Sequence, residues 1–133
     1  MKIHHIGIAT KEIDGAASLW RDLLGLQPDH TEDVPGQKVR VCMLPLADSR
    51  LELLEPMSED SPISGFLGKR GGGIHHIAVS VEDIRESLAD LKAKGARLID
   101  EEPRMGAGGC LVAFIHPSST GGVLLELVQE PQS

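Results

Sequence analysis

Two His-His pairs introduce the two halves of this chain in nearly the same surroundings. The first half opens with Ile3-His4-His5-Ile6 and the second with Ile74-His75-His76-Ile77. The halves also close alike, with Leu51-Glu52-Leu53-Leu54 in the first and Leu125-Glu126-Leu127-Val128 in the second. Imidazole and carboxylate groups both bind divalent metal ions. A duplicated unit that carries one of each could therefore bring two histidines and two glutamates to a single ion.

The alternation of side chains along a strand indicates which histidines would take part. His5 shares a strand face with Gly7 and Ala9, and His76 shares one with Ala78 and Ser80. The branched residues of both segments lie on the opposite face, which we expect to pack against helices. The small residues beside His5 and His76 should leave a cavity. The other histidines in question are predicted to be structural or to support the ligands: His4, His75 and His116.

Glu52 and Glu126 lie inside apolar runs, where an unpaired carboxylate would be costly to bury. One interpretation is that both carboxylates point to solvent and that the histidines are hydrogen-bonded core residues. The shared register of the two halves favours a metal site instead. We predict that His5, Glu52, His76 and Glu126 bind a divalent ion, and this ligand set suits Co, Zn, Mn or Ni.

The hydropathy pattern predicts the same order of elements in both halves. The first half is predicted to contain strands at 2–9, 39–44 and 50–54, helices at 12–24 and 62–67, and a loop at 31–38. Ser61 should cap the second of these helices, and the glycine-rich segment 69–73 should link the halves. In the second half we expect a helix around Ile84 to Leu91, strands at 97–99, 111–115 and 123–128, and a turn at 105–109. This pattern predicts an α+β fold of two βαβββ modules in one domain, with pseudo-repeats at 1–70 and 71–133.

The composition excludes several classes of function. A net charge of −7, no tyrosine and 2% aromatic residues argue against nucleic-acid binding, which needs a basic face and usually aromatic side chains for stacking. No apolar run reaches membrane-spanning length, and a strand is predicted from residue 2 without a charged leader. Cys42 and Cys110 are far apart, which is typical of buried thiols in a reducing compartment. We expect a cytoplasmic protein.

The two modules resemble the vicinal oxygen chelate superfamily, in which paired modules curl into a glyoxalase-like open barrel around a metal ion. Within that superfamily, the chain resembles the methylmalonyl-CoA epimerase family over nearly its whole length. The segments that carry this resemblance are Ile3 to Ala9, Glu52-Leu53-Leu54-Glu55-Pro56, Asp60-Ser61-Pro62-Ile63, Gly72 to Ile77, and His116-Pro117 through Gly122 to Leu127.

The resemblance implies an isomerase that interconverts (R)- and (S)-methylmalonyl-CoA through an enolate. It implies an acyl-CoA substrate, a divalent metal ion and, by analogy, a homodimer. Two acid/base groups must face C2 from opposite sides. Some relatives have glutamine where Glu52 stands and a glutamate base where this chain has Val41. We therefore expect Glu52 and Glu126 to be catalytic. The alternative is that Glu52 stays a metal ligand and that water or another group serves as the base.

The substrate-binding residues that we expect are Lys69 and Arg70, which could meet the phosphates of coenzyme A, together with Arg104 and Ser118. Several relatives have lysine where Ser118 stands. Gly106, Gly108 and Gly109 could give backbone access to the site or form a simple turn. Two other functions are compatible with the pattern. One is a lactoylglutathione lyase-like isomerase, which uses a similar metal site, and the other is a non-catalytic binding protein of the same fold.

Overall fold

The computed structural model describes residues 1–132, which form two compact units. The N-terminal unit comprises His5–His75, and the C-terminal unit joins Met1–His4 to the segment that begins at His76. The boundary between the units therefore passes through both His-His pairs, between His4 and His5 and between His75 and His76. Within residues 1–132, no helix combines the length and apolar composition that crossing a membrane requires.

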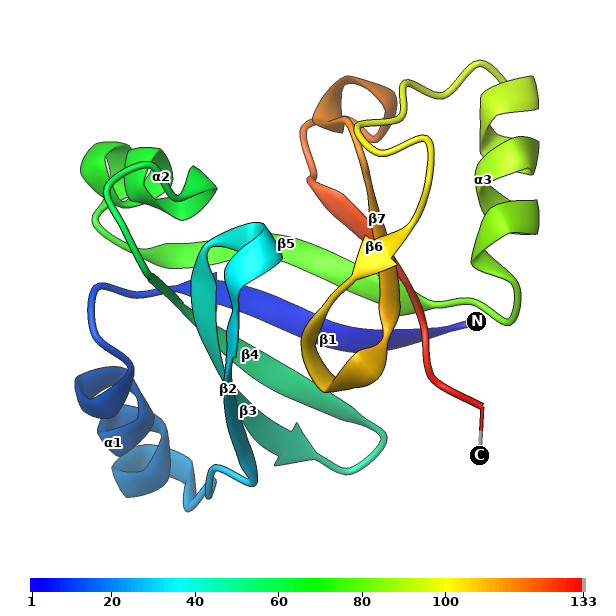
Figure 1. Cartoon of the computed structure of the whole chain (residues 1–133). Helices are drawn as coiled ribbons and strands as arrows, with labels where there is room; N and C mark the ends of the chain where they lie inside the picture. Colours follow the sequence, from blue (N-terminus) through cyan, green and yellow to red (C-terminus); the bar gives the residue numbers. More distant parts are fainter. Residues whose placement is uncertain (133) are drawn as a thin grey trace. The chain divides into compact units, whose positions relative to one another are not determined.

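The N-terminal unit contains a mixed sheet with the strand order β2-β3-β4-β1. Its elements are β1 (Lys2–Ala9, which begins in the C-terminal unit), α1 (Ile13–Leu24), β2 (His30–Val34), the short 3-10 turn η1 (Pro35–Gln37), β3 (Val39–Leu46), β4 (Ser49–Pro56) and α2 (Pro62–Arg70). β1 and β4 pair in parallel, and the other pairs are antiparallel. Helix α1 packs on β3 and β4, where Ile13, Leu44 and Leu53 are buried against half-buried Trp20 (Figure 1).

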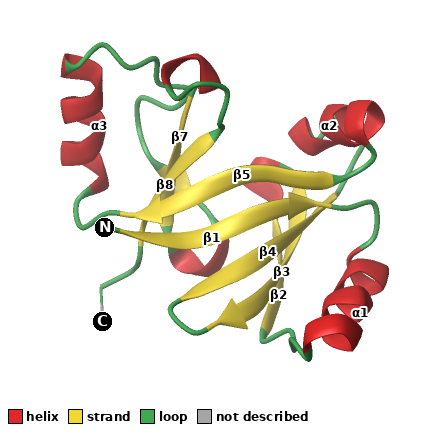
Figure 2. Cartoon of the chain, turned by 180° about the vertical axis from the view of Figure 1, so that it is seen from behind, coloured by secondary structure: helices red, strands yellow, loops and turns green. Residues whose placement is uncertain are grey.

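The C-terminal unit repeats this topology with the strand order β5-β8-β7-β6. Its elements are β5 (Gly73–Ser80, which begins in the N-terminal unit), α3 (Ile84–Ala93), β6 (Arg104–Met105), η2 (Ala107–Gly109), β7 (Leu111–Ile115), η3 (Pro117–Ser119) and β8 (Leu125–Gln129). β5 and β8 pair in parallel. Helix α3 packs on β7 and β8 through Ile84 and Leu88, and Figure 2 shows this helix beside those strands. The prediction of two βαβββ modules is confirmed.

Both repeats start their first helix with the same long-range hydrogen bond. The backbone N–H of Ile13, at the first turn of α1, donates to Glu55 Oε1 at 2.9 Å. The backbone N–H of Ile84, at the first turn of α3, donates to Gln129 Oε1 at 2.8 Å. Glu55 and Gln129 each stand three residues after the candidate ligand of their strand. This bond satisfies a helical N–H that lacks a partner within the helix, and it fixes each helix to its sheet.

Two predicted elements are wrong, and both errors concern an edge strand of a sheet. The predicted loop at 31–38 contains β2, because the polar sequence His30–Val34 pairs with β3 along the edge of the sheet, where one face can stay in water. The predicted strand at 97–99 is absent from the described residues, and Leu98 forms only an isolated bridge to Ile115. The edge strand is instead β6, at residues that we expected to begin a turn.

The connection between the repeats is shorter than predicted. Helix α2 continues to Arg70 and ends at Gly71, which adopts the left-handed conformation with a φ of 75°. Lys69 and Arg70 therefore lie in the last helical turn and not in a linker. Ser61 occupies the N-cap position as predicted, but its hydroxyl makes no capping bond among the described residues. Its carbonyl accepts from Ser64 N–H at 3.0 Å instead.

Candidate metal centre

The N-terminal unit buries one histidine against one glutamate. His5 lies on β1 and Glu52 on β4, and Glu52 stands between Gly7 of β1 and Met43 of β3. His5 Nε2 lies 3.5 Å from Glu52 Oε1. The two residues are only 2% and 6% exposed, so the carboxylate has little access to water. The parallel pairing of β1 with β4 is what brings these residues, which are distant in sequence, together.

The C-terminal unit repeats the pair at the equivalent register. His76 on β5 has its Nε2 atom 2.9 Å from Oε1 of Glu126 on β8. Glu126 stands between Ala78 of β5 and Phe114 of β7. The Phe114 ring meets the His76 imidazole edge-on, with 5.6 Å between the ring centroids. His76 and Glu126 are 3% and 4% exposed.

The donor atoms in each unit fit a divalent cation. Nitrogen and oxygen ligands lie about 2.0–2.2 Å from an ion such as Zn²⁺, so two adjacent ligands are about 2.8–3.6 Å apart. The nitrogen-to-oxygen distances of 2.9 and 3.5 Å lie within this range. Each pair also presents one neutral and one anionic donor type, the combination that Zn, Co, Ni and Mn accept. Each unit can therefore supply two neighbouring ligands.

The strand faces agree with the predicted alternation. In β1, Ile6 and Ile8 pack in the cluster beneath α1, which places them opposite His5. In β5, Val79 packs in the cluster beneath α3. The expected cavity beside the small residues is partly filled, because Ala78 is packed against Cys110, Val112 and Val128. The sequence pattern does not show that β7 places Val112 on this face.

His4, His75 and His116, which the sequence places outside the ligand set, make structural contacts. His4 Nε2 lies 3.2 Å from Glu130 Oε1 within the C-terminal unit. The His75 ring meets Phe66 edge-on at 5.2 Å. The Nδ1 atom of His116 accepts from the Ser118 backbone N–H at 3.0 Å and thereby caps the turn η3. These contacts agree with the roles that the sequence predicted for the three residues.

The predicted substrate-binding residues are distributed over both units. Lys69 and Arg70 lie at the end of α2, and the Arg70 guanidinium stands 5.5 Å from the centre of the Phe66 ring. In the C-terminal unit, Ser118 Oγ lies 2.8 Å from His116 Nδ1. Arg104 Nε lies 3.3 Å from Asp100 Oδ1. Asp100 was not identified from the sequence, because nothing in its local pattern marks it.

Cys42 and Cys110 are buried thiols, as predicted. Cys42 lies in the cluster beneath α1, on the face opposite Glu52. Burial raises the pKa of the Cys42 thiol, and a side-chain hydrogen bond with Thr31 acts in the other direction. A neutral, buried thiol is a poor nucleophile, so Cys42 belongs to the core and not to the candidate site.

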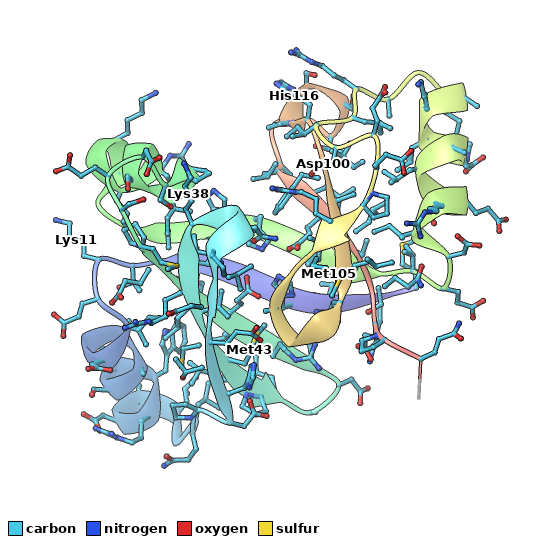
Figure 3. The ribbon with its side chains drawn as sticks, in the orientation of Figure 1. Lys11, Lys38, Met43, Asp100, Met105 and His116 are labelled. Carbon is cyan, nitrogen blue, oxygen red and sulfur yellow. The ribbon has the colours of Figure 1, made fainter. Side chains whose placement is uncertain are left out.

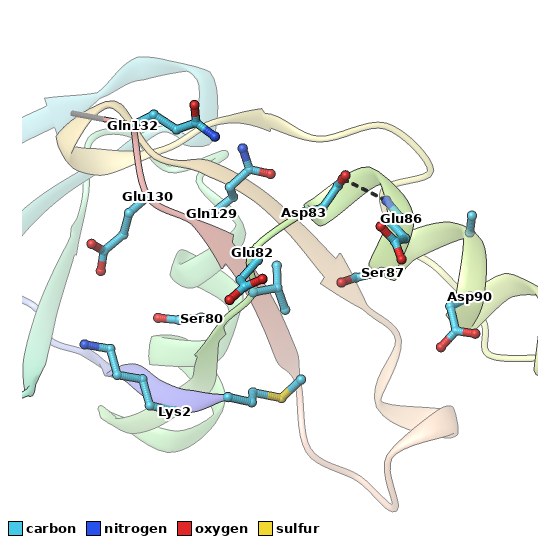
Figure 4. Close-up of a pocket in the computed structure, with 13 residues that line it drawn as sticks. Lys2, Ser80, Glu82, Asp83, Glu86, Ser87, Asp90, Gln129, Glu130 and Gln132 are labelled. Atoms are coloured by element: carbon cyan, nitrogen blue, oxygen red, sulfur yellow. Dashed lines mark hydrogen bonds between the residues drawn. The ribbon is translucent and has the colours of Figure 1, made fainter.

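A hollow on the C-terminal unit lies apart from the candidate ligands. Figure 4 shows that acidic side chains dominate its lining, with Asp83 accepting a hydrogen bond from the Glu86 backbone N–H at 3.0 Å. The labelled side chains around it are Lys2, Ser80, Glu82, Asp83, Glu86, Ser87, Asp90, Gln129, Glu130 and Gln132. Anionic substrates would be repelled by this surface, so the hollow does not suit an acyl-CoA.

Comparison with known proteins supports a specific family. Residues 4–114 match the model of the glyoxalase/bleomycin resistance protein/dioxygenase superfamily. The chain is 42% identical to the ethylmalonyl-CoA/methylmalonyl-CoA epimerase of Cereibacter sphaeroides, over 96% of this chain and 97% of that protein. It is 40% identical to the mitochondrial methylmalonyl-CoA epimerase of Mus musculus, over 96% of this chain and 72% of that protein.

A solved structure gives the same result. A variant of Streptomyces coelicolor methylmalonyl-CoA epimerase, in complex with 2-nitronate-propionyl-CoA, is 40% identical and superposes with a TM-score of 0.93. The alignment covers 98% of this chain and 94% of that one. The fold is therefore the predicted α+β fold of the vicinal oxygen chelate type, with two βαβββ modules. This chain belongs to the glyoxalase/bleomycin resistance protein/dioxygenase superfamily and, within it, to the methylmalonyl-CoA epimerase family.

Proposed function

We propose that this chain is an isomerase that interconverts (R)- and (S)-methylmalonyl-CoA with the help of one divalent metal ion. The observation that carries the proposal is the repetition of a buried His–Glu pair at the same register in both repeats. The full-length similarity to epimerases supplies the substrate class. The proposed ligands are His5, Glu52, His76 and Glu126.

The proximity of three proposed ligands supports a single shared ion, because one ligand atom from each of His5, Glu52 and His76 lies within 4.8 Å of the other two. β1 carries His4 in one unit and His5 in the other, and β5 crosses the boundary at His75 and His76. Consecutive Cα atoms are about 3.8 Å apart, so each proposed histidine ligand is one residue away from the opposite unit. His5, Glu52 and His76 form a buried set of residues that could hold a cation, and Glu126 contacts His76 within its own unit.

In the proposed chemistry, the ion stabilises negative charge and the two glutamates transfer protons. A bound divalent cation would stabilise the negative charge that develops on the thioester oxygen when the proton leaves C2. We propose that Glu52 and Glu126 carry the protons, because each carboxylate has a second oxygen atom that can accept one. One glutamate, ionised at the start, removes the proton from C2 to give a planar enolate, and the other, protonated at the start, returns its proton to the opposite side.

The direct test is solvent exchange at C2. Purified protein should incorporate deuterium from D₂O into (R)-methylmalonyl-CoA and yield both epimers, as followed by NMR and mass spectrometry. It should not convert the hemithioacetal of methylglyoxal and glutathione, which is the substrate of the lactoylglutathione lyase alternative. Conversion of the hemithioacetal without exchange into methylmalonyl-CoA would favour that alternative. Absence of both reactions in metal-loaded protein would favour a non-catalytic binding protein.

Three further predictions belong to this proposal. We propose that the repeats 1–70 and 71–133 form a single domain, because the proposed site draws ligands from both. We also propose a homodimer, by analogy with related proteins, and a cytoplasmic location. Sedimentation analysis of the purified chain would test the dimer, and fractionation of cells of the source organism would test the location.

A further inference from the structure

Arg104 lies on the same sheet face as the candidate ligands of the C-terminal unit. On β6, Arg104 pairs with Val112 of β7, and Val112 pairs with Val128 of β8. Residues directly opposite one another in an antiparallel pair project to the same face. Val128 is two residues from Glu126 and shares its face, because the intervening Leu127 packs beneath α3. The register therefore directs Arg104 to the face of Glu126.

The separation suits a small ligand between the two side chains. Arg104 is two strands and two residues away from Glu126, which corresponds to about 12 Å between their Cα atoms. An extended arginine side chain, a glutamate and a small ligand can together span that distance. Arg104 is on an edge strand and its side chain is 43% exposed, so a ligand can reach its guanidinium.

Asp100 contacts both Arg104 and the backbone of Phe114, the residue that pairs with Glu126. Asp100 Oδ1 lies 3.3 Å from Arg104 Nε, and Asp100 Oδ2 accepts from the Phe114 backbone N–H at 2.9 Å. Phe114 stands opposite Glu126, and its ring contacts His76. Asp100, labelled in Figure 3, comes from the segment between α3 and β6. Because Asp100 contacts Nε, the two terminal nitrogens of Arg104 can donate to a ligand.

The N-terminal repeat carries the opposite charge at the equivalent position. Glu32 of β2 pairs with Val41 of β3, which pairs with Leu54 of β4, two residues after Glu52. Glu32 therefore has the register that Arg104 has in the other repeat. Its carboxylate contacts His30 Nε2. Of these two equivalent positions, only the one that holds Arg104 can therefore attract a carboxylate.

We propose that Arg104 binds the free carboxylate of the acyl-CoA substrate and thereby selects substrates that carry a carboxylate on C2. The inference rests on the proposed function and assigns its substrate specificity. A guanidinium donates two parallel hydrogen bonds to a carboxylate, an arrangement that an acyl group without a carboxylate cannot accept. Lys69 and Arg70 are less suited to bind this carboxylate. Both lie in the last turn of helix α2, and the Arg70 guanidinium stands over the Phe66 ring.

The test compares Arg104→Gln and Arg104→Lys with wild-type protein. We expect KM for methylmalonyl-CoA to rise about 10- to 100-fold in Arg104→Gln, the loss typical of a hydrogen bond to a charged group. Arg104→Lys should fall between the two. Wild-type protein should also bind methylmalonyl-CoA more tightly than propionyl-CoA, which lacks the carboxylate, and Arg104→Gln should lose most of this preference in calorimetric titrations. Arg97→Gln, also in the C-terminal unit, is the matched control and should behave as wild type.

The outcomes separate this inference from the proposed function. Active wild-type protein together with an Arg104→Gln variant that keeps the preference for methylmalonyl-CoA would overturn the role of Arg104 alone. Equal losses in Arg104→Gln and Arg97→Gln would indicate a general effect of charge and would also overturn it. Wild-type protein that neither exchanges C2 nor distinguishes the two acyl-CoAs would contradict both. Circular dichroism of each variant verifies that it is folded.

Discussion

Glu52 has two possible roles in the proposed site. It could act as the base that removes the proton from C2, or it could remain a metal ligand throughout the reaction. It is 6% exposed and lies 3.5 Å from His5, a position that suits a ligand. Val41, which stands where some relatives have a glutamate base, is 1% exposed and apolar. On the N-terminal side, the proposed centre thus relies on Glu52 for both metal binding and proton transfer.

The substitution Glu52→Gln separates these two functions. We expect the variant to keep its metal ion, because an amide oxygen can still coordinate, and to lose C2 exchange by about 100-fold or more, because an amide cannot accept the proton. Metal analysis and the rate of deuterium incorporation measure the two effects. Glu101→Gln, at an exposed ion pair with Lys92, is the control. Exchange at the wild-type rate in Glu52→Gln would assign the base to water or another group.

Cys42 predicts a dependence of stability on pH. Burial raises the pKa of its thiol in the folded state, so the folded protein resists ionisation that the unfolded chain allows. The stabilising contribution is complete below the unfolded pKa of about 8.5 and is lost as the pH rises through the folded pKa. Between pH 7.5 and 9.5, the free energy of unfolding should therefore fall more steeply in wild type than in Cys42→Ala, by up to about 1.4 kcal/mol per pH unit. Equal slopes in urea titrations would contradict this.

At the level of elements, the helix-to-sheet bonds through Glu55 and Gln129 predict a stability effect. Glu55→Ala and Gln129→Ala each remove the acceptor for a helical N–H and should lower the free energy of unfolding by about 1 kcal/mol. Glu55→Gln should cost much less, because glutamine makes the same bond in the second repeat. Urea unfolding of the three variants checks this. A loss in Glu55→Gln as large as in Glu55→Ala would show that charge, and not the hydrogen bond, matters.

The sequence predicts best those helices and strands whose apolar residues recur with a clear period. Helix α1 and strand β7 have clear periodicity, and both were predicted to within a residue. β2 and β6 were missed, because His30–Val34 is polar and β6 has only two residues. Pairing with a neighbouring strand defines such edges, and pairing is a property of the tertiary structure. The same limit applies to Asp100, whose contact with Arg104 depends on the β6–β7 register.

At the level of the whole molecule, duplication explains both the site and its asymmetry. The two repeats place His5 with Glu52 and His76 with Glu126 at equivalent registers. They differ where Glu32 in one repeat corresponds to Arg104 in the other. The repeated pairs suit the proposed metal site, and the charge difference gives only the C-terminal repeat a cation at this position. The repeat could be read from the sequence, whereas the equivalence of Glu32 and Arg104 required the strand register.

The stoichiometry of metal binding tests most directly whether the two pairs share one ion. Metal-free protein would be titrated with Co²⁺ by calorimetry and visible absorption, alongside His5→Ala and His76→Ala, which alter one unit each. The account predicts one ion per wild-type chain and a loss of affinity of about 100-fold or more in both variants. Two ions per chain, or wild-type affinity in either variant, would contradict it.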